Sequence, residues 1–157
     1  MAKIHLHVLA AFFILAGAAA AVEFDVEGRV YCDNCRAGFV TNVTEYIEGA
    51  TVRVECIHFL NQKVEHSVEA VTTAGGFFRV AIPNDHEEEI CYVKLVKSSR
   101  ADCVEIVPNR DQARILLTEN SGQTNNVRYA NALGFLKDEA LPGCAELLKA
   151  YALDEEY

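Results

Sequence analysis

The feature that most constrains this chain is its set of six cysteines. They stand at Cys32, Cys35, Cys56, Cys91, Cys103 and Cys144. In a secreted protein, an even number of cysteines predicts disulfide bonds, here three, that hold a small domain together. The spacing of the cysteines does not choose among the pairings that six of them allow.

The close pair Cys32-Asp33-Asn34-Cys35 has two other interpretations. A redox-active pair usually lies where a strand enters a helix, and no long helical pattern follows here. A zinc site usually needs a second close pair, whereas the remaining cysteines stand far apart. We therefore interpret all six cysteines as structural and expect no metal site.

Residues 1–21 have the pattern of a secretory signal peptide. Lys3 is followed by the apolar run Val8–Ala16 and by the small residues Ala18–Ala21, where cleavage is expected. The apolar run is shorter than the roughly 20 residues that a membrane span needs, and the acidic Glu23 follows soon after it. We expect a secreted, extracellular protein with one domain over 22–157 and no membrane insertion after cleavage.

The charge of the predicted mature chain excludes two classes of partner. Without Lys3, 13 basic and 23 acidic residues remain, a formal charge of −10. Binding to nucleic acid or to anionic lipid requires a basic surface, so neither partner is expected. The chain is also too apolar to be disordered.

Hydrophobic and polar residues alternate in several short segments, as they do in half-buried strands. The segments cover 24–30, 51–56, 64–70, 78–82 and 91–96, and a further apolar run covers 113–118. The Gly75-Gly76 turn predicts a hairpin of strands 64–72 and 77–82. Only 144–151 has a helical pattern. The sequence predicts an all-β fold, a compact antiparallel β-barrel or sandwich with a short C-terminal helix.

Signals of catalysis are weak in this sequence. It contains no nucleophile elbow, zinc-protease motif or phosphate-binding loop. The acidic run Asp85–Glu89 could bind a cation, but neighbouring residues in an extended chain point apart, which favours a solvated loop. We expect no enzymatic activity and no cofactor.

The chain contains one glycosylation sequon, Asn42-Val43-Thr44. It lies in a polar link between two predicted strands, so exposure is expected. In a secreted protein this position predicts an N-linked glycan on Asn42.

Residues 27–36 read EGRVYCDNCR and resemble the signature of the pollen Ole e I-like family, which includes the olive major pollen allergen and grass pollen relatives. Ala37-Gly38-Phe39, Glu48-Gly49-Ala50, Asp85-His86 and Asn131–Phe135 are also typical of that family. One small departure is Ala132, where family members often have proline. The signature residues are Glu27, Gly28, Val30, Tyr31, Cys32, Asp33, Cys35 and Arg36.

The resemblance implies a fold, a disulfide pairing and a role. The fold is an antiparallel β-barrel or sandwich of about seven strands, and the implied pairs are Cys32–Cys103, Cys35–Cys144 and Cys56–Cys91. The role is that of a secreted, non-enzymatic and allergenic glycoprotein in pollen hydration, germination or tube growth. Its partner would be a protein receptor or a cell-wall component, and acidic loop residues 85–89 would favour a basic partner surface.

Two other functions stay open at this point. A small secreted β protein can inhibit proteases if a rigid loop presents a specificity residue, for which Arg100 and Arg110 are the candidates. It can also carry a small apolar ligand in its interior, although the predicted core is large enough to fill a small barrel.

Overall fold

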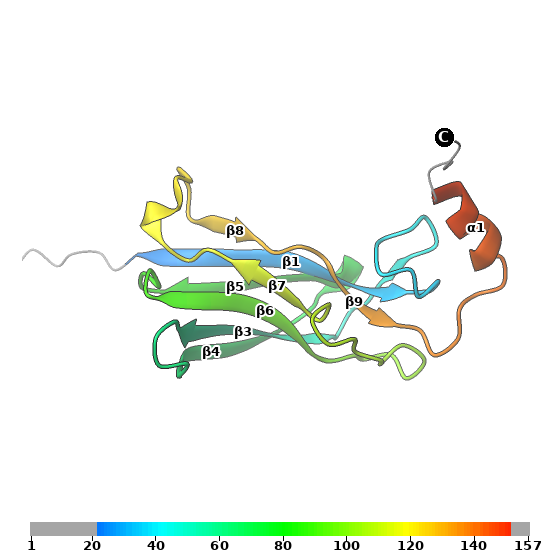
Figure 1. The fold of residues 1–157 in the computed structure, drawn as a ribbon, viewed down its shortest axis with the longest axis horizontal. Coiled ribbons are helices and arrows are strands. Elements are labelled where there is room, and N and C mark those ends of the chain that lie inside the picture. The colour runs from blue at the N-terminus through cyan, green and yellow to red at the C-terminus, as the bar shows by residue number, and fades with distance from the viewer. Residues whose placement is uncertain (1–21, 152–157) are drawn as a thin grey trace, which may run out of the picture.

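Two β-sheets lie face to face and enclose one hydrophobic core (Figure 1). The structure, a computed structural model, describes residues 22–151. The predicted signal peptide, 1–21, therefore lies outside the described residues, as do residues 152–157. The all-β prediction is confirmed, and of the two expected forms the fold is the sandwich.

Nine strands and three short helical segments make up the described chain. The first sheet contains β1 (Glu23–Asp33), β2 (Glu45–Tyr46), β5 (Phe77–Pro83), β8 (Val127–Tyr129) and β9 (Leu133–Leu136). The second sheet has the order β4 (Val64–Val71), β3 (Thr51–His58), β6 (Glu89–Lys97) and β7 (Gln112–Ile115). The helical segments are η1 (Ala74–Gly76), η2 (Glu119–Ser121) and α1 (Cys144–Tyr151).

The predicted hairpin of 64–72 with 77–82 is wrong. β4 pairs with β3, and β5 pairs with β1 in the other sheet. Gly75 and Gly76, with φ of 72° and 70°, form a turn that carries the chain from one sheet to the other. A Cβ on Gly76 would lie 2.3 Å from the carbonyl oxygen of Val30, so this turn packs directly on β1. Alternation predicted which side of each strand is buried but not which strand would be its neighbour.

The first sheet is mixed rather than antiparallel. β8 and β9 both pair with β1 in the parallel direction, along successive stretches of that long strand. The antiparallel expectation is correct for the second sheet, in which every pair of neighbouring strands is antiparallel. β8 and β9 are too short to show a clear alternation in the sequence.

The core consists of the inward-facing residues of both sheets. Phe24, Val26 and Val30 of β1 pack with Val52 and the other buried residues of the second sheet. These side chains pack between the sheets and form the core. No helix among the residues that the structure describes is long and apolar enough to span a membrane.

Candidate functional site

The signature lies on β1 and the turn that follows it. Residues 27–33 belong to the strand, and Cys35 and Arg36 belong to the turn. The structure gathers Cys32, Asp33, Cys35 and Arg36 at one end of the sandwich, whereas Glu27 and Gly28 lie farther back along β1. We call this end, formed by segments 33–45, 98–107 and 136–144, the signature end.

Two disulfides link the close cysteine pair to distant parts of the chain. Cys32 is bonded to Cys103, and Cys35 is bonded to Cys144 at the start of α1. The third bond, Cys56–Cys91, joins paired residues of β3 and β6. These are the pairs that the family resemblance implies. The close cysteine pair thus fastens two segments to the end of β1 instead of closing on itself.

Asp33 and Asn34 hold the turn that follows β1. Asp33 is only 1 % exposed, and its carboxylate accepts hydrogen bonds from the backbone nitrogens of Ala37 and Gly38. The Asn34 side chain donates to the carbonyl oxygen of Val43 at 2.7 Å. The backbone carbonyl of Asn34 accepts from the nitrogen of Leu141. Both residues therefore fix backbone geometry, and neither is exposed to act on a substrate.

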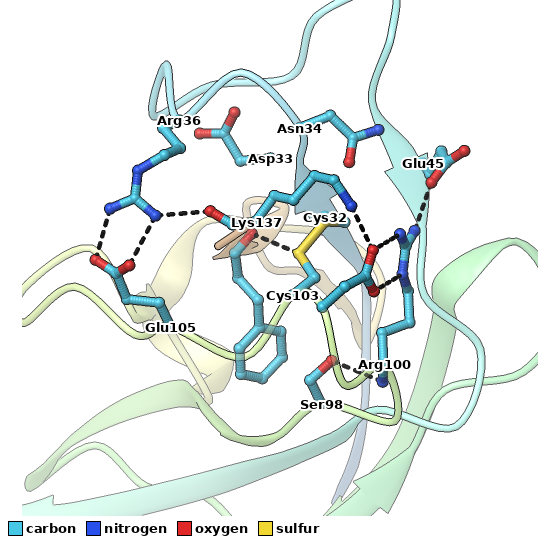
Figure 2. Close-up of a disulfide and its surroundings, with 12 residues drawn as sticks. Cys32, Asp33, Asn34, Arg36, Glu45, Ser98, Arg100, Cys103, Glu105 and Lys137 are labelled. Carbon is cyan, nitrogen blue, oxygen red and sulfur yellow. Dashed lines mark hydrogen bonds and ion pairs between the residues drawn. A yellow bond between two sulfur atoms is a disulfide. The ribbon is translucent and has the colours of Figure 1, made fainter. Parts of the chain in front are cut away.

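Arg36 connects the turn to both neighbouring segments (Figure 2). Its guanidinium donates to the two carboxylate oxygens of Glu105, at 2.7 and 2.9 Å. It also donates to the carbonyl oxygen of Lys137 at 2.6 Å. A planar guanidinium suits this forked contact, which a lysine could not reproduce.

A second set of charges, which includes Arg100 and Glu45, lies on the other side of the Cys32–Cys103 bond from Arg36 and Glu105 (Figure 2). Arg100 donates to both carboxylate oxygens of Asp102, at 3.0 and 2.8 Å, and also to Glu45. Lys137 forms an ion pair with the same Asp102 carboxylate. The signature end is therefore held by a network of ion pairs in addition to its disulfides.

The charged partners shift one another's protonation equilibria. Hydrogen bonds from Arg100, and next from Lys137, hold the pKa of Asp102 well below its usual range. The hydrogen bond from Arg36 likewise lowers the pKa of Glu105. These carboxylates are stabilised as anions, which suits a structural ion pair and not a general acid.

The ring of Tyr31 lies across Gly134 on the paired strand β9. A Cβ on Gly134 would lie 2.5 Å from Cζ of that ring, so the close approach requires glycine. Burial, and then the charge of Asp33, raise the pKa of the Tyr31 hydroxyl. This contact packs Tyr31 of β1 against Gly134 of the neighbouring strand β9.

Several apolar side chains of the signature end remain exposed to solvent. Phe39 is 44 % exposed and contacts Tyr151 of α1 edge to face, with ring centroids 5.6 Å apart. Val104 and Ile106 flank Glu105 and are also exposed. The further exposed apolar residues here are Val40, Val43 and Leu141. Exposed apolar side chains on a rigid support are typical of a protein-binding surface.

Asn42 lies at the same end of the molecule. It is exposed in the turn between Thr41 and Thr44, and its backbone nitrogen donates to the hydroxyl of Tyr151. The exposure that the sequon requires is therefore present.

The acidic run 85–89 lies at the opposite end, in the connection between β5 and β6. Glu87 and Glu88 are exposed, as expected of a solvated loop, but that expectation is wrong for His86 and Glu89. His86 is only 8 % exposed, and its Nδ1 lies 2.8 Å from the carboxylate of Glu89. Asp85 accepts a hydrogen bond from the backbone nitrogen of Glu119. About half of the run therefore organises the loop itself.

Near the Cys56–Cys91 bond, four side chains have the composition of a metal site. Potential ligand atoms of Cys56, His86, Glu89 and Cys91 all lie within 4.8 Å of one another. The two sulfurs are bonded to each other, so neither is the thiolate that a metal would require. The group therefore consists of the disulfide and the His86–Glu89 contact beside it.

The two arginines considered for protease inhibition lie in different surroundings. Arg100 is committed to Asp102 and Glu45. The guanidinium of Arg110 lies against Gly38, where a Cβ would be 1.7 Å from its nitrogen. Arg100 is thus engaged in ion pairs, whereas Arg110 is exposed at the surface beside Gly38.

Sequence reasoning missed most members of the ion-pair network. Arg36 belongs to the signature, and Arg100 was a candidate only as a protease-inhibitor specificity residue. The other members had no predicted role: Glu45, Asp102, Glu105 and Lys137. Arg100 and Asp102 come from one loop and Lys137 from the residue after β9, so only the fold brings them together. No pattern of spacing along the chain could have identified the group.

Comparison with known proteins gives consistent matches. The sequence matches the family described as "Pollen protein Ole e 1 like" over residues 22–152. It is 52 % identical over 134 residues to "Pollen-specific protein C13" of Zea mays, covering 85 % of this chain and 79 % of that one. It is 45 % identical over 130 residues to "Anther-specific protein LAT52" of Solanum lycopersicum, covering 83 % and 81 %. The crystal structure of the major plantain pollen allergen Pla l 1 superposes with a TM-score of 0.71 at 33 % identity, covering 78 % of this chain and all of that one.

Proposed function

The chain belongs to the pollen protein Ole e 1-like family, and from this membership we propose that it is a secreted recognition protein of pollen. It acts without catalysis, by binding a receptor protein or a wall component during pollen hydration, germination or tube growth. Its relatives include pollen-specific and anther-specific proteins and pollen allergens, which supports both the tissue and an allergenic character.

The observation that carries this proposal is the construction of the signature end. Exposed Phe39, Val104 and Ile106 lie on segments that two disulfides and a set of ion pairs hold in place. A surface that is ordered before binding loses little conformational entropy when a partner docks. The charged residues next to these apolar side chains are already paired with one another. They therefore hold the shape of the surface and do not supply a reactive group.

Other features support the secreted, non-enzymatic and glycosylated character. Three disulfides suit an oxidising compartment. Exposed Asn42 offers an acceptor for a glycan at the signature end, next to the exposed Val43. The buried acids Asp33 and Glu89 serve backbone and histidine contacts.

Affinity capture tests the proposal. The oxidised chain 22–157 is immobilised and exposed to extracts of pollen and pistil membranes and walls, with reduced and alkylated protein as the control. We expect a receptor ectodomain or wall component to be enriched on the oxidised form and lost on a Val104→Ser, Ile106→Ser variant. Equal recovery on the oxidised and reduced forms would contradict a folded recognition surface.

A further inference from the structure

A second surface, on the outer face of the first sheet, is unrelated to the signature end. Asp25, Glu27 and Arg29 alternate along β1 with the buried residues of that strand. β8 and β5 lie on either side of β1 (Figure 1). Each places an aromatic residue beside β1, because Tyr129 of β8 is paired with Glu27 and Phe77 of β5 is paired with Arg29.

A groove of about 250 Å³ runs between these two aromatic residues. Its walls are Tyr129, which is 75 % exposed, and Phe77, which is 46 % exposed. Glu27 and Arg29 lie between them, with small residues such as Ala130 and Ala132 completing the lining. The groove thus combines the exposed ring of Tyr129 with a carboxylate and with the guanidinium of Arg29, which covers one face of Phe77.

The guanidinium of Arg29 is held flat and keeps its donors free. It stacks on the ring of Phe77, 3.7 Å from the centroid, and lies 4.7 Å from the ring centroid of Tyr46. Within the described chain, 22–151, no hydrogen bond or ion pair is formed by this side chain. Stacking fixes the plane of a guanidinium while leaving the N–H groups at its edge available to a ligand.

The four charged side chains around the groove, Asp25, Glu27, Arg29 and Arg79, balance one another. Arg79 donates to the carboxylate of Asp25 at 3.1 and 2.7 Å and lies 3.3 Å from that of Glu27. With Arg29, two acidic and two basic side chains lie around the groove, and the exposed Glu23 at the start of β1 adds one further acidic side chain to this face. A neutral ligand is therefore favoured over a charged one. An acidic polymer would in addition be repelled by the formal charge of −10 that the mature chain carries.

From these features we propose that the outer face of β5, β1 and β8 binds a neutral polysaccharide built of hexopyranose units. A pyranose ring has apolar C–H faces that pack on aromatic rings, and a rim of hydroxyls that pair with carboxylates and guanidinium N–H groups. A peptide that pairs as an added strand would lie at the outer edge of β5 or β8 and not over the groove, because β1 already has hydrogen-bonded strands on both sides. The inference goes beyond the proposed function, since it assigns a different surface and gives that surface a ligand of stated chemistry.

Affinity electrophoresis of the oxidised chain 22–157 tests this assignment. Native gels contain xyloglucan, β-1,4-galactan or hydroxyethylcellulose as neutral polymers, or polygalacturonate as the acidic one. We expect at least one neutral polymer to retard the protein. Tyr129→Ala should weaken that binding about threefold to tenfold, the range expected for loss of one aromatic contact. Tyr129→Phe, which keeps the ring, should retain it.

The controls separate loss of the site from loss of the fold. Phe59→Ala removes an exposed aromatic ring from the connection between β3 and β4 and should leave binding unchanged. Near-ultraviolet circular dichroism shows whether each variant keeps its packed core. Retardation by none of the neutral polymers, retardation by polygalacturonate alone, or equal retardation of Tyr129→Ala and the parent would each overturn the proposal. None of these outcomes bears on the partner of the signature end.

Discussion

The guanidinium of Arg36 bonds both carboxylate oxygens of Glu105, at 2.7 and 2.9 Å, across 69 residues of sequence. This contact joins the turn after β1 to the loop that carries Cys103. Because Arg36 also donates to the carbonyl oxygen of Lys137, one side chain spans all three segments of the signature end. The charge network is therefore a cross-link that complements the Cys32–Cys103 bond.

Acid should weaken this cross-link. Hydrogen bonds from Arg100 and Lys137 place the pKa of Asp102 below the ordinary value of 3.8, so the unfolded chain binds this proton first as the pH falls. The contribution to stability is complete above pH 4 and is lost as the pH decreases below that value. Asp102→Asn should reduce the slope of unfolding free energy against pH between about pH 4 and 2. Urea titrations at several pH values measure the slope, and an unchanged slope would contradict the assignment.

Arg128 should be the most sensitive charged residue of the fold. It is 2 % exposed, and its guanidinium donates to the carbonyl oxygens of Leu116, Asn125 and Thr118. Arg128→Lys keeps the charge but cannot reach these acceptors together, so it should lower the unfolding free energy by about 2–4 kcal/mol. The exposed Arg114→Lys is the matched control and should change it by less than about 0.5 kcal/mol. Similar urea midpoints for the two variants would refute this role.

Gly134 should tolerate no larger residue while Tyr31 is present. Gly134→Ala would bring a Cβ to 2.5 Å from the Tyr31 ring and should lower the unfolding free energy by about 1–3 kcal/mol. In a Tyr31→Leu background the same change should have a much smaller effect, because the ring that it meets is gone. A double-mutant cycle measures the difference. Additive effects of the two substitutions would show that the contact does not determine the cost.

The disulfides should differ in what they stabilise. Cys35–Cys144 spans 109 residues and anchors α1, whereas Cys56–Cys91 spans 35 residues within one sheet. In the chain-entropy model, replacing either pair by alanine costs about 4–5 kcal/mol. Loss of Cys35–Cys144 should in addition release α1, which amide hydrogen exchange would show as fast exchange at Leu147. Equal protection of Leu147 in both variants would contradict this.

The sequence predicted which residues form strands better than it predicted which strands pair with one another. Alternation in 24–30, 51–56 and 91–96 correctly identified strands, because a half-buried strand imposes that period on its own residues. Pairing depends on which faces meet in space, which is why Gly75-Gly76 was misread as a hairpin turn. The short strands β8 and β9 have only three and four residues, too few for a period to appear.

Only the part of the candidate site that lies in one contiguous motif could be predicted from the sequence, for a similar reason. Cys32, Cys35 and Arg36 lie in one contiguous motif, so a resemblance could identify them. Glu105 and Lys137 acquire their role only when the loops meet, and a single charged residue in a loop carries no sign of its partner. The groove between Phe77 and Tyr129 likewise depends on two strands that pair with opposite edges of β1.

Binding to living tissue tests the central claim most directly. The oxidised protein 22–157 is labelled at its N-terminus, and its saturable binding to germinating pollen tubes and stigmas is measured against two variants. Val104→Ser, Ile106→Ser alters the signature end, and Phe59→Ser, Leu60→Ser alters exposed apolar residues at the opposite end. We predict that the first variant loses binding about tenfold or more, as truncation of a central contact does, while the second binds like the parent. Equal binding of all three proteins would contradict recognition through the signature end.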